Sequence, residues 1–350
     1  MTSNASTVRS AQVGGHRSVS SNSPATVLRS GTELIRATKA FAKDNAVYSW
    51  WAFVSTGLIF AVAWAAAVFS DIWYLRLCAA FVAGLSYVRF FCLYHDHQHH
   101  AILPKSKTMR VLMRAWGIIG LAPNSTWSHS HNYHHAHNSQ LHADSIGSFP
   151  VMTLERFESL SRVERWRYLI NRHPLTILCG YAATFLYAMC WNSFREDPRK
   201  HRDCLFALVL HAVLYIGMIA AFGWAGAFFG VFLPFAVAGA VGTYLFYAQH
   251  SFPGVKLEEK NNGWTFEGAA LESSSFCKMG PLMRYFTANI GYHHIHHLNH
   301  KIPFYRLPEA FRAMPELQRV KTTSLRIPDI RRCLSLKVWC TATRQLVPIR

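Results

Sequence analysis

The feature that most limits the fold of this chain is a set of long segments without charged side chains. Ala46 to Phe69 contains no Asp, Glu, Lys or Arg, and neither does the longer run from Cys204 to Ala248. Between them, Ile72 to Cys92 carries only Arg76 and Arg89, each close to one end of the segment. A helix needs about 20 apolar residues to cross a bilayer. These blocks therefore predict membrane-spanning helices rather than the dispersed apolar pattern of a soluble core.

The third apolar block is long enough for two crossings. The sequence Gly-Trp-Ala-Gly at 223–226 marks a turn near its middle, because glycine favours tight changes of chain direction. We therefore expect an all-α integral membrane protein with four transmembrane helices in two hairpins. The expected spans are 46–69, 72–92, 204–224 and 226–248.

The net charge of +18 lies outside these spans. The segment before Ala46 and the tail after Lys301 are both rich in Arg and Lys. Cytoplasmic flanks of membrane helices favour these residues, so both termini are expected in the cytoplasm, which requires an even number of crossings. The same basic face suits lipid headgroups and an acidic electron-donor protein. A nucleic-acid partner is not expected for such a chain.

Three histidine clusters lie beside the apolar blocks, at 95–100, 131–135 and 293–297. Residues at i, i+3 and i+4 share one face of a helix, so each cluster directs two or three imidazoles toward one point. Neutral imidazole binds iron, zinc and copper well, and so many imidazoles exceed what one ion uses. We expect a two-metal site in a cytoplasmic cap. The eight candidate ligands in the clusters are His95, His99, His131, His134, His135, His293, His296 and His297.

A single site requires all three clusters on one side of the membrane. The segment Val111 to Pro123 is too short to cross, and basic residues flank Pro174 to Trp191 at both ends, so we expect both to be in-plane or re-entrant. His250 follows the last span at the same membrane face and is a ninth candidate ligand. His211 lies alone within an apolar block and is given no role, and Asp96 is a candidate acceptor that orients a ligating imidazole.

The ligand type leaves the metal open. Zinc suits imidazole but brings no redox chemistry, whereas iron beside an apolar bundle favours oxygen activation against a lipid chain. A histidine-rich metal carrier without redox activity is the alternative from another functional class. A transporter would instead place several ionisable groups within the spans.

The regions outside the spans divide the chain into three parts. We expect a basic, Ser-rich tail at 1–45 that is largely disordered at its start, a membrane domain at 46–310 and a basic cytoplasmic segment at 311–350. The first residues contain no apolar stretch typical of a signal peptide. The eight cysteines form no C-x-x-C pair and are expected to be reduced thiols.

The histidine motifs and their surroundings resemble those of the integral-membrane fatty acid desaturases. The pattern of that family is H-x(3,4)-H followed by two H-x-x-H-H boxes, and the resemblance extends from about Tyr48 to Leu307. The stretches Ser130 to His137 and Asn289 to Tyr305 resemble the bacterial acyl-lipid desaturases of the Δ12 (ω-6) type.

The resemblance implies an O2-dependent enzyme that introduces a cis double bond into a membrane fatty acyl chain carried by phospholipid or coenzyme A. It implies two Fe2+ ions held by the eight cluster histidines and His250, with electrons from a separate ferredoxin or cytochrome b5. Relatives of the stearoyl type have an asparagine one turn before the histidine that corresponds to His250, where this chain has Phe246. The enzyme would be a multi-pass membrane protein with its active site in the cytoplasm, and in a bacterium it would lie in the inner membrane.

The nearest alternative uses the same histidine boxes for another product. A membrane hydroxylase or ketolase acting on acyl, alkane or carotenoid substrates shares the oxidant, and the choice between desaturation and hydroxylation depends on substrate placement that no motif encodes.

Overall fold

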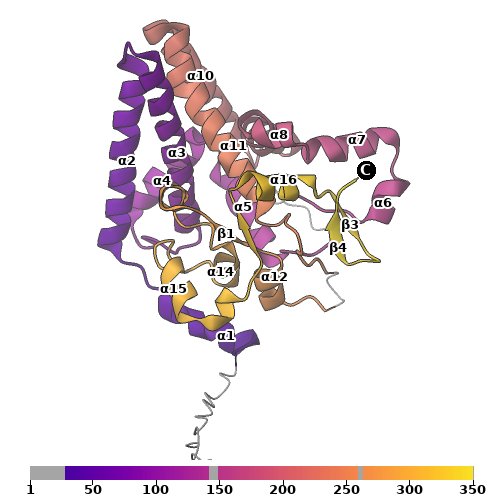
Figure 1. Cartoon of the computed structure of the whole chain (residues 1–350). Coiled ribbons are helices and arrows are strands. Elements are labelled where there is room, and N and C mark those ends of the chain that lie inside the picture. Colours follow the sequence, from indigo (N-terminus) through magenta and orange to yellow (C-terminus); the bar gives the residue numbers. More distant parts are fainter. Residues whose placement is uncertain (1–27, 142–148, 259–262, 350) are drawn as a thin grey trace, which may run out of the picture.

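The computed structural model describes residues 28–141, 149–258 and 263–349, and these parts are mostly helical (Figure 1). The elements of the first half are α1 (Gly31–Thr38), η1 (Lys39–Phe41), α2 (Ala46–Phe69), α3 (Trp73–Gln98), α4 (Lys107–Ile119), α5 (Asn124–Ala136), α6 (Leu154–Ser159), α7 (Arg162–Asn171) and α8 (Pro174–Leu178). Those that follow are η2 (Tyr181–Asn192), α9 (Ser193–Glu196), α10 (Arg202–Ala227), η3 (Phe228–Phe232), α11 (Leu233–Ala248), α12 (Phe266–Glu272), α13 (Pro281–Phe286), α14 (His293–Leu298), α15 (Leu307–Ala313), η4 (Pro315–Gln318) and α16 (Ile327–Ser335).

Within the described ranges, three helices are long and apolar enough to cross a membrane: Ala46–Phe69, Trp73–Gln98 and Arg202–Ala248. The first begins at Asn45, whose side chain accepts a hydrogen bond from the backbone N–H of Tyr48 and so caps the helix. The first two helices form an antiparallel hairpin, and α11 packs on the other side of α3. Membrane helices are therefore supported, as expected from the uncharged blocks.

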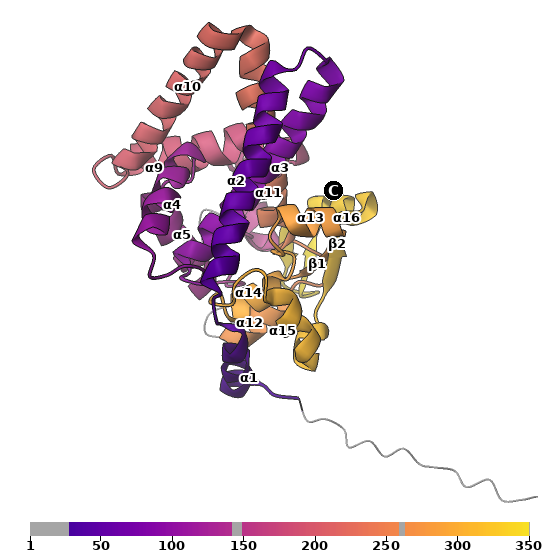
Figure 2. The same ribbon diagram turned by 90° about the vertical axis from the view of Figure 1, so that its left-hand side faces the viewer.

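The third of these helices is sharply bent, as the glycines at 223 and 226 predict. Gly223 has a φ of 66°, a left-handed conformation inside an otherwise helical segment that L side chains avoid. A Cβ on Gly226 would lie 2.2 Å from Cβ of Phe222, which leaves room only for glycine. The chain consequently folds back, so that α10 rises and α11 descends beside α3 (Figure 2). Each arm is the length of one expected span.

The segments expected to be in-plane are short helices. α4 covers most of Val111 to Pro123, and α8 with η2 covers Pro174 to Trp191. Neither is among the three helices long enough to cross a membrane in the described parts of the chain. The helix η2 packs against α10 and α11, so it belongs to the bundle.

A cap of short elements covers one end of the bundle (Figure 1). In this cap, Leu34 of α1 is fully buried against Ile295 and Leu298 of α14 and Leu307 of α15. Glu316 accepts a hydrogen bond of 2.7 Å from Nε of Arg29, which connects the segment just before α1 to η4. This packing fixes the helix that carries the third histidine cluster.

Four short strands lie in the cap, although the sequence predicted an all-helical protein. β1 (Phe276–Lys278) pairs in parallel with β2 (Thr322–Ser324), and β3 (Val338–Cys340) pairs antiparallel with β4 (Gln345–Val347). A strand of three residues is too short to show the alternation that identifies strands in sequence. The expectation of disorder at the start of the N-terminal tail concerns residues 1–27, which lie outside the described residues.

Candidate metal centre

Four separate stretches of chain bring histidines to one place at the end of the bundle (Figure 1). The end of α3 supplies His95 and His99, and His250 follows directly after α11. α5 and α14 each carry three further histidines of the i, i+3, i+4 pattern. In the described chain, their ring nitrogens form two groups, and within each group the nitrogens lie within 4.8 Å of one another.

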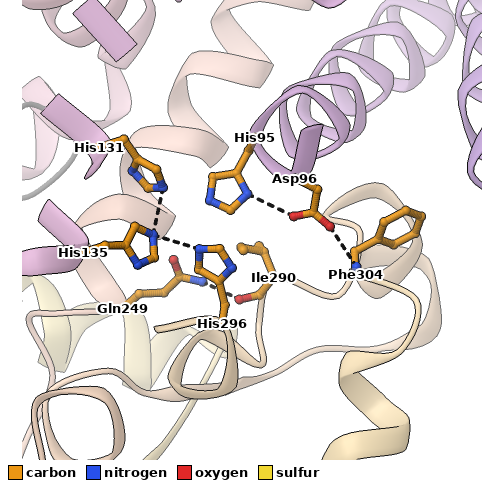
Figure 3. Close-up of polar contacts among 8 residues, drawn as sticks. All are labelled: His95, Asp96, His131, His135, Gln249, Ile290, His296 and Phe304. Carbon is orange, nitrogen blue, oxygen red and sulfur yellow. Dashed lines mark hydrogen bonds and ion pairs between the residues drawn. The ribbon is translucent and has the colours of Figure 1, made fainter. Parts of the chain in front are cut away.

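The first group has five members, His95, His99, His131, His135 and His296. The Nε2 atom of His135 lies 3.1 Å from that of His131 and 3.0 Å from that of His296 (Figure 3). All five residues are buried.

The second group has four members, His134, His250, His293 and His297. The Nε2 atom of His250 lies 3.1 Å from that of His134 and 2.9 Å from that of His293. The Nε2 atoms of His293 and His297 are 3.0 Å apart. Neighbouring positions on α5 thus serve different groups, since His134 belongs to the second group and His135 to the first.

These short distances fit metal ligation better than hydrogen bonding. A neutral ring nitrogen carries either one hydrogen or one lone pair, yet Nε2 of His135, of His250 and of His293 each approaches two other Nε2 atoms. Two nitrogens bound to one ion at about 2.1 Å lie roughly 3 Å apart when the bonds meet at a right angle. Nε2 of His99 is buried without a hydrogen-bond partner among the described residues. The donors therefore fit two imidazole-bound metal ions.

Hydrogen bonds orient two of the rings. Nδ1 of His95 donates to Oδ1 of Asp96 at 3.1 Å, and Oδ2 of Asp96 accepts the backbone N–H of Phe304 at 2.8 Å (Figure 3). Nδ1 of His250 donates to the carbonyl of Ser273 at 3.0 Å. A proton fixed on Nδ1 leaves the lone pair of Nε2 facing the group. Asp96 therefore orients His95 as the sequence suggested.

Burial keeps these imidazoles neutral. Removal from water lowers the pKa of most histidines in the two groups well below the usual value, and neighbouring imidazoles lower it further. These histidines are His99, His131, His134, His135, His293, His296 and His297. Burial also lowers the pKa of His250 to about 4, although its hydrogen bond to Ser273 opposes the shift. At neutral pH these eight rings are thus neutral, which is the form that binds metals.

An apolar cavity leads from the two groups into the bundle. It is lined by His131, His134 and His250 together with Phe246 and Leu245, among other residues. A second cavity among the helices shares three lining residues with it, Val88, Phe91 and Gly242. The two apolar cavities therefore adjoin, one inside the bundle and one at the histidines, and together they are called the slot.

An aromatic stack lies against one wall of this slot. The fully buried ring of Trp127 stacks on His131, with ring centroids 4.4 Å apart, and on Phe246 at 5.8 Å. The stack restricts rotation of His131 and continues the apolar lining up to the first group.

The structure brings together all nine histidines named from the sequence. His211, which was given no role, lies apart from the groups and contacts the hydroxyl of Tyr181. His294 points elsewhere, because its Nε2 lies 3.0 Å from the carbonyl of Leu317.

Two residues at the groups were missed in the sequence. The ring centroid of His300 lies 4.6 Å from that of His99, and its signal in the sequence is its position four residues after His296. Gln249 lines the slot and donates from Nε2 to the carbonyl of Ile290 at 2.9 Å. The only sequence signal for Gln249 is its position next to His250.

A third set of potential ligands has a structural explanation. His201, Asp203 and Cys204 lie close together at the start of α10. A carboxylate oxygen of Asp203 accepts the backbone N–H of Ser125 at 3.0 Å, within the first turn of α5. This contact satisfies a free N–H and places a negative charge at the positive end of the helix that carries His131 to His135.

Comparison with known proteins identifies the type of protein with this arrangement. The family model described as "Fatty acid desaturase" matches residues 72–324. A protein of Bacillus subtilis (strain 168) named "Fatty acid desaturase" is 30% identical over 329 residues, which cover 93% of this chain and 92% of that protein. Two proteins named "sn-1 oleoyl-lipid 12-desaturase" match 70% of this chain and 70% of their own length. The protein of Picosynechococcus sp. is 21% identical and that of Anabaena variabilis 23%.

Proposed function

This chain belongs to the fatty acid desaturase family and is a desaturase enzyme, and on that premise we propose that it introduces a cis double bond into the acyl chain of a membrane lipid. The reaction would use O2, two histidine-bound iron ions and electrons from a separate donor protein. The observation that carries this proposal is the meeting of the two histidine groups with the apolar slot.

We propose that the first metal is held by His95, His99, His131, His135 and His296, and the second by His134, His250, His293 and His297. Both ligand sets consist of neutral imidazoles, which suit iron, and a redox-active ion is needed for an oxidative reaction. Iron ions bound there would supply the reduction of O2 that drives removal of two hydrogens from neighbouring methylenes.

The residues of the chain hold the substrate and exclude water. Val88, Phe91 and Phe246 line the slot beside the histidines and would keep an acyl chain extended past both groups. Each buried methylene contributes about 0.8 kcal/mol, so the slot lining sets which carbon lies next to the metals. The stack of Trp127 on His131 limits ring motion during this positioning.

The proposed setting is the inner membrane of a bacterium with four crossings. The two arms of the helix bent at Gly223 would each cross once, which places the histidine groups and both termini in the cytoplasm. The basic residues on that face would attract an acidic donor such as ferredoxin or cytochrome b5. We retain 1–45, 46–310 and 311–350 as the proposed tail, membrane domain and C-terminal segment.

The test is expression in a host that lacks polyunsaturated lipids, followed by mass spectrometry of the acyl chains. The expected result is one new species with one more double bond than its precursor, absent in a His296→Ala variant. A hydroxylated or oxo product would instead assign the related hydroxylase or ketolase activity. Unchanged lipids despite iron-loaded protein and a working electron donor would contradict both.

A further inference from the structure

A third cavity, open and of about 530 Å³, lies on the flank of the bundle between α2, α3 and α13. Its walls include Trp51 and Ile59 of α2, Arg89 of α3, and Arg284 and Tyr285 of α13. Several of these residues are exposed, so the cavity is a groove at the surface of the protein. The groove, defined by these five residues, is separate from the slot that reaches the histidines.

Arg89 is the unusual residue of this groove. It lies in the apolar helix α3, only 5% of its surface is exposed, and it forms no ion pair within residues 28–141, 149–258 and 263–349. Its Nε donates to Oγ1 of Thr56 at 3.0 Å, and its guanidinium lies 3.9 Å from the ring centroid of Tyr285. One of its terminal NH2 groups also donates to the backbone carbonyl of Tyr285. These contacts orient the guanidinium, but all the partners are neutral, so its charge has no counterion. An uncompensated charge in a membrane helix is costly and marks a functional site.

Arg284 brings a second positive charge to the same groove. It is exposed on α13 and also has no ion pair in the described chain. Two guanidinium groups in one groove repel each other, and a bound anion would relieve that repulsion and accept charge-assisted hydrogen bonds. A phosphate matches the planar donors of arginine well.

The surroundings of the groove indicate a lipid as the source of this phosphate. Trp51 is 63% exposed, and the next turns of α2 expose Val54 and Leu58 on the same side. Leu282 of α13 is 66% exposed beside Arg284. Exposed apolar side chains on a membrane helix face lipid, and Trp and Tyr gather at the level of the headgroups. The groove therefore opens toward the bilayer, where a soluble ligand would gain nothing from the apolar flank.

We propose that Arg89 and Arg284 bind the phosphate of a glycerophospholipid whose acyl chains lie along the exposed face of α2. The groove lies beside the metal centre but shares no lining residue with the slot, so this lipid is distinct from the substrate of the proposed function. Val88 and Ile290 line the slot, whereas their chain neighbours Arg89 and Asn289 line the groove. His95 follows Arg89 by six residues, about 9 Å along the helix axis. One thin wall thus separates the headgroup position from the slot.

Binding is tested on the full-length protein in detergent by native mass spectrometry with added phosphatidylglycerol. We expect Arg284→Gln to weaken phospholipid binding about tenfold, the loss of one charge-assisted contact, and Arg284→Glu to weaken it further. The matched control is Arg312→Gln, another exposed arginine on a short helix, which lies outside the groove. Diacylglycerol, which has the same chains and no phosphate, should bind the wild type and the Arg284 variants equally.

Equal phosphatidylglycerol binding by Arg284→Gln and Arg312→Gln would overturn the proposal. Displacement of the lipid by low concentrations of inorganic phosphate or a coenzyme A thioester would also overturn it, because the site would then serve a soluble phosphate. If no lipid is desaturated at all, the binding result still decides the phosphate site, so the two proposals fail separately.

Discussion

At the scale of single residues, His134 and His129 offer a direct comparison on α5. His134 is buried and lies in the second histidine group, whereas His129 is exposed on the same helix. We expect His134→Ala to lower turnover by at least about 100-fold, because even residues that only support metal ligands change activity by 10–100-fold. Iron content and unsaturated product should fall together, while His129→Ala keeps both. Full activity of His134→Ala would remove this residue from the metal site.

Asp96 supports a ligand without belonging to either group. Its carboxylate accepts hydrogen bonds from Nδ1 of His95 and the backbone N–H of Phe304. In Asp96→Asn, one of these donors would face the NH2 group of the new side chain and lose its acceptor. We therefore expect the affinity for iron to fall about 10–100-fold, so that a chelator removes iron from the variant more easily. Iron retained during dialysis against the chelator measures this effect. Asp71→Asn, in the exposed turn between α2 and α3, is the control, and equal retention by both variants would contradict the role of Asp96.

The sequence predicts the site residues that repeat a spacing, and His250 from its position, but it misses residues that only the folded chain brings to the site. The i, i+3, i+4 pattern identifies the cluster histidines because helix geometry alone places such residues on one face. His250 was found through its position at the end of an apolar block. Gln249 follows no pattern. His300 lies four residues after His296, but α14 ends at Leu298, so helix spacing alone does not place it at the groups.

At the scale of elements, α11 forms one wall of the slot through Gly242. A Cβ on Gly242 would lie 3.7 Å from the ring of Phe185, an ordinary contact, so a small side chain fits there and a large one enters the slot. We expect Gly242→Leu to lower turnover of long acyl chains at least about tenfold, since an obstructed slot displaces the reacting carbon, with iron content unchanged. The amount of unsaturated acyl product in the expression host measures this turnover.

The matched control for this substitution is Gly217→Leu on α10. A Cβ there has no neighbour within 4 Å, so the added side chain faces away from the protein. Normal turnover in Gly242→Leu would show that the substrate does not occupy this part of the slot.

Long elements were predictable from sequence, and short ones were not. The absence of charge from Ala46 to Phe69 and the glycines at 223 and 226 predict a helix and a bend because burial in lipid and backbone sterics act locally. The strands β1 and β2 pair residues that are far apart in sequence. Their pairing depends on the packing of the cap, which no local pattern encodes.

At the scale of the whole molecule, the buried imidazoles make stability depend on pH. The pKa of His134, His250 and His297, among others, lies in the folded chain below the unfolded value of about 6.5, so between the two values the unfolded chain binds more protons. The free energy of unfolding is therefore highest above about pH 6.5 and falls as the pH drops through that value. For His250 the loss ends below its folded pKa of about 4. The unfolding midpoint of metal-free protein, measured from about pH 8 down to about pH 5, should decrease below pH 6.5, and a constant midpoint would contradict neutral burial of these rings.

The central claim is that nine imidazoles from four distant stretches of the chain bind two iron ions. The most direct measurement is the metal content of the purified full-length protein, determined by mass spectrometry after growth with iron and zinc both present. We predict close to two irons per chain, falling in His134→Ala and unchanged in His129→Ala. One metal per chain, or zinc in place of iron in an active preparation, would contradict the account.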